Sequence, residues 1–160
     1  MNNDILRKKE NNMGLDHKPD KLDDELCFAI YTAQKIYNKF YASALKEYKL
    51  TYPQYITLLT LWENGEPMMI KEIGAKLSLD NGTLTPLLKR MEKDGWIERK
   101  HSEEDGRRVY IILSKKGKNK KYEIKGKLTS CFANVDMTSQ EYKDDVSLIK
   151  SIGRRLDPES

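Results

Sequence analysis

The chain has 160 residues, of which 38% are hydrophobic and 34% charged, a size and composition that suit one domain, alone or with helical extensions. No run of 18 apolar residues occurs and residues 1–21 lack the apolar segment of a secretion signal, so we expect no membrane association. The two cysteines, Cys27 and Cys131, are too few for a disulfide framework and lack metal-ligand spacing. We therefore expect a cytoplasmic protein without metal or cofactor.

The net charge of +4 is unevenly distributed along the chain. Residues 1–26 hold five Lys/Arg against seven Asp/Glu, whereas residues 71–127 hold sixteen against nine, a net of +7. The middle of the chain is the candidate contact for a polyanion. A solvated lysine-rich surface would give the same count.

The N-terminal half is predicted to be helical after a polar lead. Residues 1–21 are poor in apolar side chains and are expected to be disordered. Apolar residues then recur at steps of three and four from Leu22 to Tyr48, which predicts one long amphipathic helix. The segment 51–53 interrupts it, Pro53 suits the first turn of a second helix that reaches Trp62, and residues 64–67 form a turn.

A helix–turn–helix and a hairpin are predicted next. Helices are expected at about 70–77 and 82–93, separated by a turn at 78–82, with Asp94-Gly95 ending the second helix. Pro86 falls early in this helix, where its missing N–H costs little if it lies in the first turn. Residues 96–100 and 108–113 are predicted strands, joined by a polar hairpin tip at 101–107.

Two more helices are predicted at the C-terminal end. Ser114 is expected to cap a lysine-rich helix that runs to about Ser130. Thr138 and Glu141 form a capping box that opens a last helix, with an apolar face from Tyr142 to Leu156.

This order of elements is that of a winged helix–turn–helix, so we expect a mainly α fold with a small β-hairpin (α+β) and DNA binding. Residues 51–113 would form the DNA-binding region, while 22–50 and 114–160 would form a helical dimerisation region. The apolar faces of the flanking helices are most economically buried against a second copy through a two-fold axis. A homodimer would read a palindromic operator in double-stranded DNA, with half-site centres about 10–10.5 bp apart.

The candidate DNA-binding residues lie on the second helix and on the hairpin. Small polar side chains at the start of the helix can approach base edges, basic side chains later in it can meet phosphates, and an arginine at the hairpin tip can enter a narrow minor groove. The residues expected to contact DNA are Asn81, Thr83, Thr85, Pro86, Lys89, Arg90, Arg107 and Arg108.

Two segments carry a resemblance to the MarR family of transcription regulators: residues 79–92 (LDNGTLTPLLKRME) and 102–108 (SEEDGRR). The motifs LCFAIY at 26–31 and TYPQY at 51–55, with Tyr41 between them, resemble the OhrR group of organic-hydroperoxide-sensing repressors. The resemblance covers residues 22–156 and assigns the wing aspartate and the minor-groove arginine to Asp105 and Arg107.

The resemblance also implies a redox-sensing site. The reactive cysteine of the group falls on Cys27, and the two tyrosines that hydrogen-bond its sulfur from the partner subunit fall on Tyr41 and Tyr52. Cys131 falls where a two-cysteine subgroup has the cysteine that closes an intersubunit disulfide. Phe28 and Trp62 would suit the apolar pocket of the group.

The residues themselves fit this chemistry. Only a thiolate attacks a peroxide, and Cys27 lies near the start of its helix, where the helix dipole favours an anion. The acidic residues 23–25 would oppose the thiolate if they pointed towards it. A sulfenic acid formed by the peroxide would condense with a nearby thiol to give a disulfide.

Three functions remain open from the sequence. The first is a repressor that releases its operator when organic hydroperoxide oxidises Cys27. The second is a MarR-type repressor released by a non-covalently bound phenolic molecule, with Cys27 silent. The third is a thiol peroxidase, which is disfavoured because it gives the basic helix–turn–helix no purpose; we therefore expect no enzyme. Cys27 and the tyrosines could also be ordinary apolar packing residues.

Overall fold

The computed structural model describes residues 20–101 and 108–157. The chain divides into two units, residues 1–40 and residues 41–160. Unit 1 holds a short 3-10 helix, η1 (Leu22–Asp24), and most of helix α2 (Leu26–Ala44), which continues into unit 2. No helix in the described ranges is long and apolar enough to cross a membrane.

Helix α2 is shorter than the predicted helix from Leu22 to Tyr48. Glu25 is extended, and its carbonyl accepts from the amides of Phe28 and Ala29, so the α-helix begins at Leu26. At the other end the chain forms a second 3-10 helix, η2 (Lys46–Tyr48), and turns at Lys49, which has a φ of 53°. This left-handed residue stops the helix before the next element.

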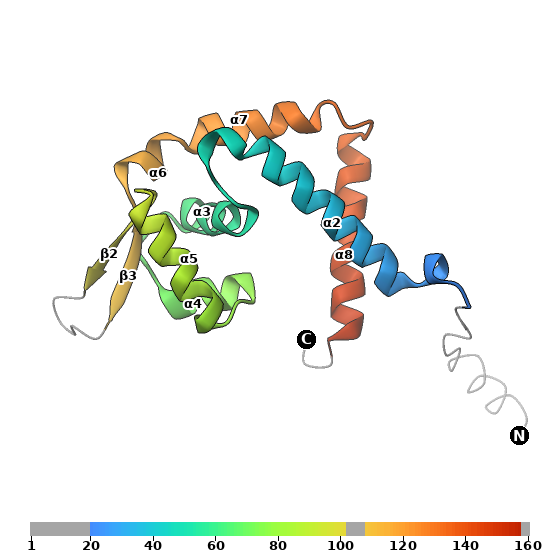
Figure 1. The fold of residues 1–160 in the computed structure, drawn as a ribbon, viewed down its shortest axis with the longest axis horizontal. Helices are drawn as coiled ribbons and strands as arrows, with labels where there is room; N and C mark the ends of the chain where they lie inside the picture. The colour runs from blue at the N-terminus through green and yellow to red at the C-terminus, as the bar shows by residue number, and fades with distance from the viewer. Residues whose placement is uncertain (1–19, 102–107, 158–160) are drawn as a thin grey trace, which may run out of the picture. The chain divides into compact units, whose positions relative to one another are not determined.

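The helix–turn–helix lies in unit 2 and agrees with the prediction. Helix α3 (Tyr52–Asn64) begins at a capping box of Thr51 and Gln54 and ends at Gly65, whose φ is 77°. Helices α4 (Ile70–Leu77) and α5 (Asn81–Lys93) follow. In Figure 1 these three helices lie together, with the β2–β3 hairpin beside α5.

The turn between α4 and α5 is tight. Ser78 has a φ of 52°, and the amide of Leu79 returns to the carbonyl of Gly74 at 3.0 Å. A Cβ atom on Gly74 would lie 2.8 Å from the carbonyl oxygen of Leu79. Glycine is therefore required at position 74 because the chain passes too close for a side chain.

The sheet has three strands in the order β1-β3-β2, all antiparallel. The predicted hairpin is β2 (Ile97–His101) paired with β3 (Val109–Leu113), with Ile97 opposite Leu113 and His101 opposite Val109. The third strand, β1 (Met68–Met69), pairs with β3 and was not predicted.

Helix α5 ends as the sequence predicted. Gly95 has a φ of 75°, and its amide donates to the carbonyl of Glu92 at 2.9 Å. The amide of Trp96 donates to the carbonyl of Met91 at 2.8 Å. This is a Schellman motif, and the side chains of Met91 and Trp96, the two positions that usually form its apolar contact, are both buried.

The predicted lysine-rich helix is broken into α6 (Lys115–Asn119) and α7 (Lys121–Phe132). The carbonyl of Gly117, which a continuous helix would pair with the amide of residue 121, accepts instead from the indole N–H of Trp62 at 2.9 Å. Ser114 caps α6 as predicted, since its hydroxyl oxygen accepts from the amide of Gly117 at 3.0 Å.

The last helix, α8 (Ser139–Leu156), begins at the predicted capping box of Thr138 and Glu141. None of its residues is buried; Leu148, Ile149 and Leu156 are 55%, 67% and 70% exposed. The core of unit 2 lies elsewhere, between α3, α4, α5 and the sheet. Its fully buried side chains include Leu58, Ile73, Leu84, Leu88, Met91, Ile97 and Ile111.

Candidate DNA-binding and sensing sites

Helix α5 has one apolar face and one polar face. Leu84, Leu88 and Met91 are fully buried, which fixes the helix on the domain. Five of the predicted DNA-binding residues on the opposite side are exposed, and a sixth, Thr85, is half-buried. The exposed five are Asn81, Thr83, Pro86, Lys89 and Arg90. This face has the small polar start and the basic continuation that a major-groove helix needs.

The start of α5 is held by Asp80. Its carboxylate accepts from the amide of Thr83 at 3.0 Å and from the hydroxyl of Thr83 at 2.7 Å. These hydrogen bonds, with the side-chain bond from Thr83 first, lower the pKa of Asp80. The hydroxyl proton of Thr83 is thus committed to the cap, and its oxygen remains available as an acceptor.

Pro86 is the sixth residue of α5, early in the helix but beyond the first turn, so the condition under which its missing N–H costs little is not met. Because proline has no N–H, the carbonyl of Gly82 one turn earlier receives no helical hydrogen bond from it. That carbonyl lies among the exposed polar residues at the start of α5.

The base of the wing, which is the β2–β3 hairpin, contacts the end of α5. The guanidinium Nε of Arg99 on β2 lies 3.2 Å from a carboxylate oxygen of Glu92 on α5. The amide of Ser114 bonds to the carbonyl of Trp96 at 3.1 Å. Of the predicted wing contacts, Arg108 is exposed immediately before β3, while Asp105 and Arg107 lie outside the described residues.

Cys27 is exposed and is the second residue of α2. Its Sγ donates to a carboxylate oxygen of Glu25 at 3.9 Å, so one of the three acidic residues before the helix does point towards it. Cys131 is half-buried in the last turn of α7. Both cysteines are free thiols, and they belong to different units.

The two tyrosines that the resemblance assigns to sensing are in contact. The ring centroids of Tyr41, at the C-terminal part of α2, and Tyr52, at the start of α3, are 4.9 Å apart with planes inclined by 59°. Tyr41 is 8% exposed and Tyr52 is half-buried. Burial, and to a lesser degree the nearby hydroxyl of Tyr142, raise the pKa of Tyr52, so this phenol remains a hydrogen-bond donor at neutral pH.

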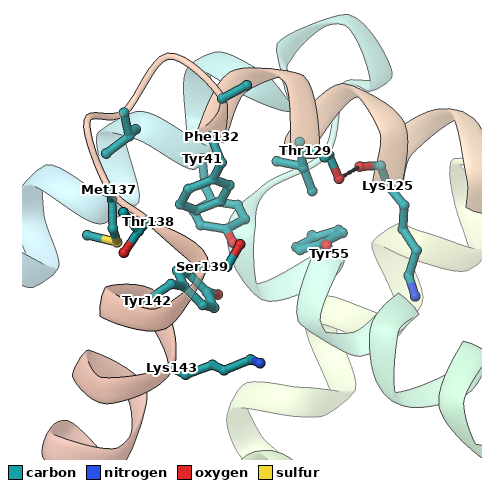
Figure 2. A pocket seen from close by; sticks show the side chains of 13 residues that line it. Tyr41, Tyr55, Lys125, Thr129, Phe132, Met137, Thr138, Ser139, Tyr142 and Lys143 are labelled. Carbon is teal, nitrogen blue, oxygen red and sulfur yellow. Dashed lines mark hydrogen bonds between the residues drawn. The ribbon is translucent and has the colours of Figure 1, made fainter.

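Tyr41 also lines an open pocket of about 730 Å³ within unit 2 (Figure 2). The walls come from the end of α2, from α3 and α7, and from the start of α8 with the linker before it. Rings form much of the surface: Tyr41 contacts Tyr55 at 5.7 Å and Phe132 at 6.1 Å, and Phe132 contacts Tyr142 at 5.8 Å. A pocket of this size and apolar lining suits a small organic molecule.

Sequence reasoning missed two members of this aromatic cluster. Phe132 contacts Tyr41, and Tyr142 lies near Tyr52 and contacts Phe132. These are tertiary contacts, which no local sequence motif predicts. Trp62, expected in an apolar sensing pocket, is 6% exposed and bonds to Gly117 at the base of α6. It is not among the residues that line the pocket.

A family model described as "Transcriptional regulator SarA/Rot" matches residues 39–124. The chain belongs to this family. Its fold is the winged helix of MarR-type regulators, which confirms both the fold class and the family predicted from the sequence. The protein is a DNA-binding transcriptional regulator of the MarR/OhrR type.

Three known proteins illustrate the relationship. The chain is 48% identical to the HTH-type transcriptional regulator TtmR of Methylorubrum extorquens over 69% of its own length and 54% of that protein's. It is 42% identical to the organic hydroperoxide resistance transcriptional regulator of Bacillus subtilis, over 82% of this chain and 86% of the relative. A structure of reduced AbfR bound to DNA is 29% identical, with a TM-score of 0.75 over 98% of this chain and 96% of that one.

Proposed function

We propose that this regulator is a redox-sensing repressor that releases its operator when an organic hydroperoxide oxidises Cys27. The thiolate of Cys27 attacks the terminal oxygen of the hydroperoxide, the O–O bond breaks, and the alkoxide leaves and takes up a proton as the alcohol. Cys27 is left as a sulfenic acid. Condensation with the thiol of Cys131 from a second subunit then forms the S–S bond and releases water.

The observation that supports this proposal most is the contact between Tyr41 and Tyr52. The two phenol rings have centroids 4.9 Å apart. In this proposal both hydroxyls would donate to one sulfur atom, and hydrogen bonds to a thiolate favour the charged form. The chain that carries them is also 42% identical, over 82% of its length, to a regulator named for organic hydroperoxide resistance. The motif residues Cys27, Tyr41 and Tyr52 are all present.

The active species in this proposal is a homodimer. Apolar side chains of α2 are exposed, with Leu26 at 52% and Ile36 at 71%. Helix α8 exposes a second apolar face. Burial of such faces against a second copy removes apolar area from water, which is the usual driving force for a stable dimer, and it would supply Tyr41 and Tyr52 to the partner's Cys27.

The proposed output is the register of two α5 helices on a palindromic operator. Asn81, Thr83 and Thr85 would face base edges, with Pro86 beside them, while Lys89 and Arg90 would meet phosphates. In the wing, Arg107 would enter the minor groove, and Asp105 and Arg108 would be further DNA-binding residues. A disulfide requires Cα atoms within about 7 Å. If the reduced dimer holds the two cysteines farther apart, closing the bond would move the helices that carry them and shift the two α5 helices out of register.

The redox step can be tested by mass spectrometry and non-reducing gels. Reduced protein is treated with cumene hydroperoxide at one equivalent per subunit. We expect one disulfide that joins Cys27 to Cys131 and a dimer-sized band that is absent in Cys131→Ser. A disulfide confined to one chain, or no oxidation of Cys27, would reject the mechanism.

A second candidate is release by a small phenolic ligand that binds without covalent chemistry. The open aromatic pocket beside Tyr41 and Tyr55 supports it. The two candidates differ in their dependence on the thiol: a ligand-released repressor keeps its response in Cys27→Ser, and a redox sensor loses it.

A further inference from the structure

The pocket beside Tyr41 has an unbalanced charge. Its lining is mainly aromatic and apolar, and the only charged side chains among the lining residues are Lys125 and Lys143. No aspartate or glutamate is present in that lining. An apolar pocket with two uncompensated ammonium groups is complementary to an apolar molecule that carries a negative charge.

The two lysines come from different elements of unit 2. Lys125 extends from α7 and Lys143 from the first turns of α8, and in the view of Figure 2 they flank Tyr55. Both are exposed, and among the described residues neither ammonium group takes part in an ion pair. The hydrogen bond drawn in Figure 2 joins the Thr129 hydroxyl to the backbone carbonyl of Lys125, so it leaves the ammonium group unused.

We propose that Lys125 and Lys143 select organic hydroperoxides that carry a carboxylate, by binding the carboxylate at the mouth of the pocket while the apolar part lies against the aromatic cluster. This inference rests on the proposed redox function, because it names the class of oxidant that the site prefers. The hydroperoxide group of the bound molecule would lie near Tyr41, the residue proposed to hold Cys27.

A pair of oxidants of matched shape tests this selection. Cumene hydroperoxide with a para-carboxylate and its methyl ester have the same reacting group and differ in charge. The rate of Cys27 sulfenic acid formation is measured for each in the Cys131→Ser background at low salt. We expect the acid to react roughly five-fold faster than the ester, because two exposed charge pairs each contribute a factor of about two to three.

The lysines are then removed one at a time. In Lys125→Gln and Lys143→Gln the acid-to-ester ratio should fall by about two- to three-fold each, and in the double variant it should approach one. Added salt should reduce the wild-type ratio in the same direction. Lys150→Gln is the matched control, since Lys150 lies on α8 but does not line the pocket, and it should keep the wild-type ratio.

Binding of the non-oxidising acid, para-isopropylbenzoate, separates the site from the redox chemistry. Its affinity, measured by calorimetry, should fall in the double variant and persist in Cys27→Ser. If para-isopropylbenzoate binds but Cys27 reacts with no hydroperoxide, the proposed redox function is rejected while the assignment of the pocket to an apolar carboxylate stands. Equal rates for acid and ester in the wild type would overturn the selection. An unchanged acid-to-ester ratio in the double variant would also overturn it. So would the absence of para-isopropylbenzoate binding because a second copy of the chain fills the pocket. Release of DNA by para-isopropylbenzoate alone would overturn the assignment to hydroperoxides.

Discussion

The hydroxyl of Ser114 donates a hydrogen bond of 2.6 Å to the carbonyl of Gly95, and the same oxygen accepts from the amide of Gly117 at 3.0 Å. One side chain therefore caps α6 and fixes it to the end of α5. Lys116 strengthens this junction: its ammonium group bonds to the carbonyl of Asp94 at 2.7 Å and lies 4.1 Å from the centre of the Trp96 ring. The wing and the proposed DNA-reading helix share this anchor.

Ser114→Ala should lower the free energy of unfolding by about 1–2 kcal/mol, because it removes a helix cap and leaves the carbonyl of Gly95 without its bond. Urea denaturation of the reduced protein measures the change. Ser130→Ala is the control: its hydroxyl bonds only to the carbonyl of Lys127 within the exposed face of α7, and its effect should be smaller. Equal losses in the two variants would refute the anchor.

Gly74→Ala should destabilise the protein by about 1–3 kcal/mol, because the new Cβ would meet the carbonyl oxygen of Leu79 at 2.8 Å and open the turn before α5. Operator affinity should fall with it. A Cβ on Gly126 in α7 has nothing within 4 Å, so Gly126→Ala should stabilise the protein by roughly 0.5–1 kcal/mol through helix propensity. A neutral Gly74→Ala would contradict the tight turn.

The helix–turn–helix was predictable because its signals are local. Three of these signals depend only on neighbours in sequence: the N-cap at Asp80, the helical spacing of the buried Leu84, Leu88 and Met91, and the Schellman motif at Gly95. The β2–β3 hairpin likewise follows from two β-rich segments around a polar tip.

The features that the sequence did not reveal depend on distant partners. β1 has only two residues and exists through its pairing with Ile111 and Tyr110. The break between α6 and α7 follows from Trp62, 55 residues before Gly117. The pocket depends on Tyr142 reaching Phe132, a contact between helices that periodicity cannot place.

Tyr48→Phe should change the dependence of stability on alkaline pH. Burial, followed by the nearby carboxylates of Glu47 and Glu123, raises the pKa of Tyr48 from 10.0 to about 12. Because the folded state holds this proton more tightly, the tyrosine contributes stability below pH 10 that is lost as the pH rises through about 12. The wild type should therefore lose more stability than Tyr48→Phe between pH 10 and 12, as measured by urea denaturation. Parallel profiles would show that Tyr48 ionises normally.

Tyr52→Phe should leave reduced operator binding intact and slow the oxidation of Cys27 by about ten-fold, because one hydrogen bond to a charged group is worth about 1.5 kcal/mol. The rate of thiol loss under cumene hydroperoxide measures this effect. Tyr122→Phe is the matched control, since Tyr122 is 80% exposed and lies on α7 away from the pocket lining. A wild-type rate in Tyr52→Phe would remove Tyr52 from the sensing site.

The most direct test is operator affinity before and after oxidation, in the wild type and in Cys27→Ser. A palindromic operator is first selected from a random duplex library with the reduced protein, and its binding is followed by fluorescence anisotropy at physiological salt. The proposed switch predicts a loss of at least ten-fold in wild-type affinity on treatment with cumene hydroperoxide, restored by dithiothreitol, and no change in Cys27→Ser. Release of the operator by Cys27→Ser under the same treatment would contradict it.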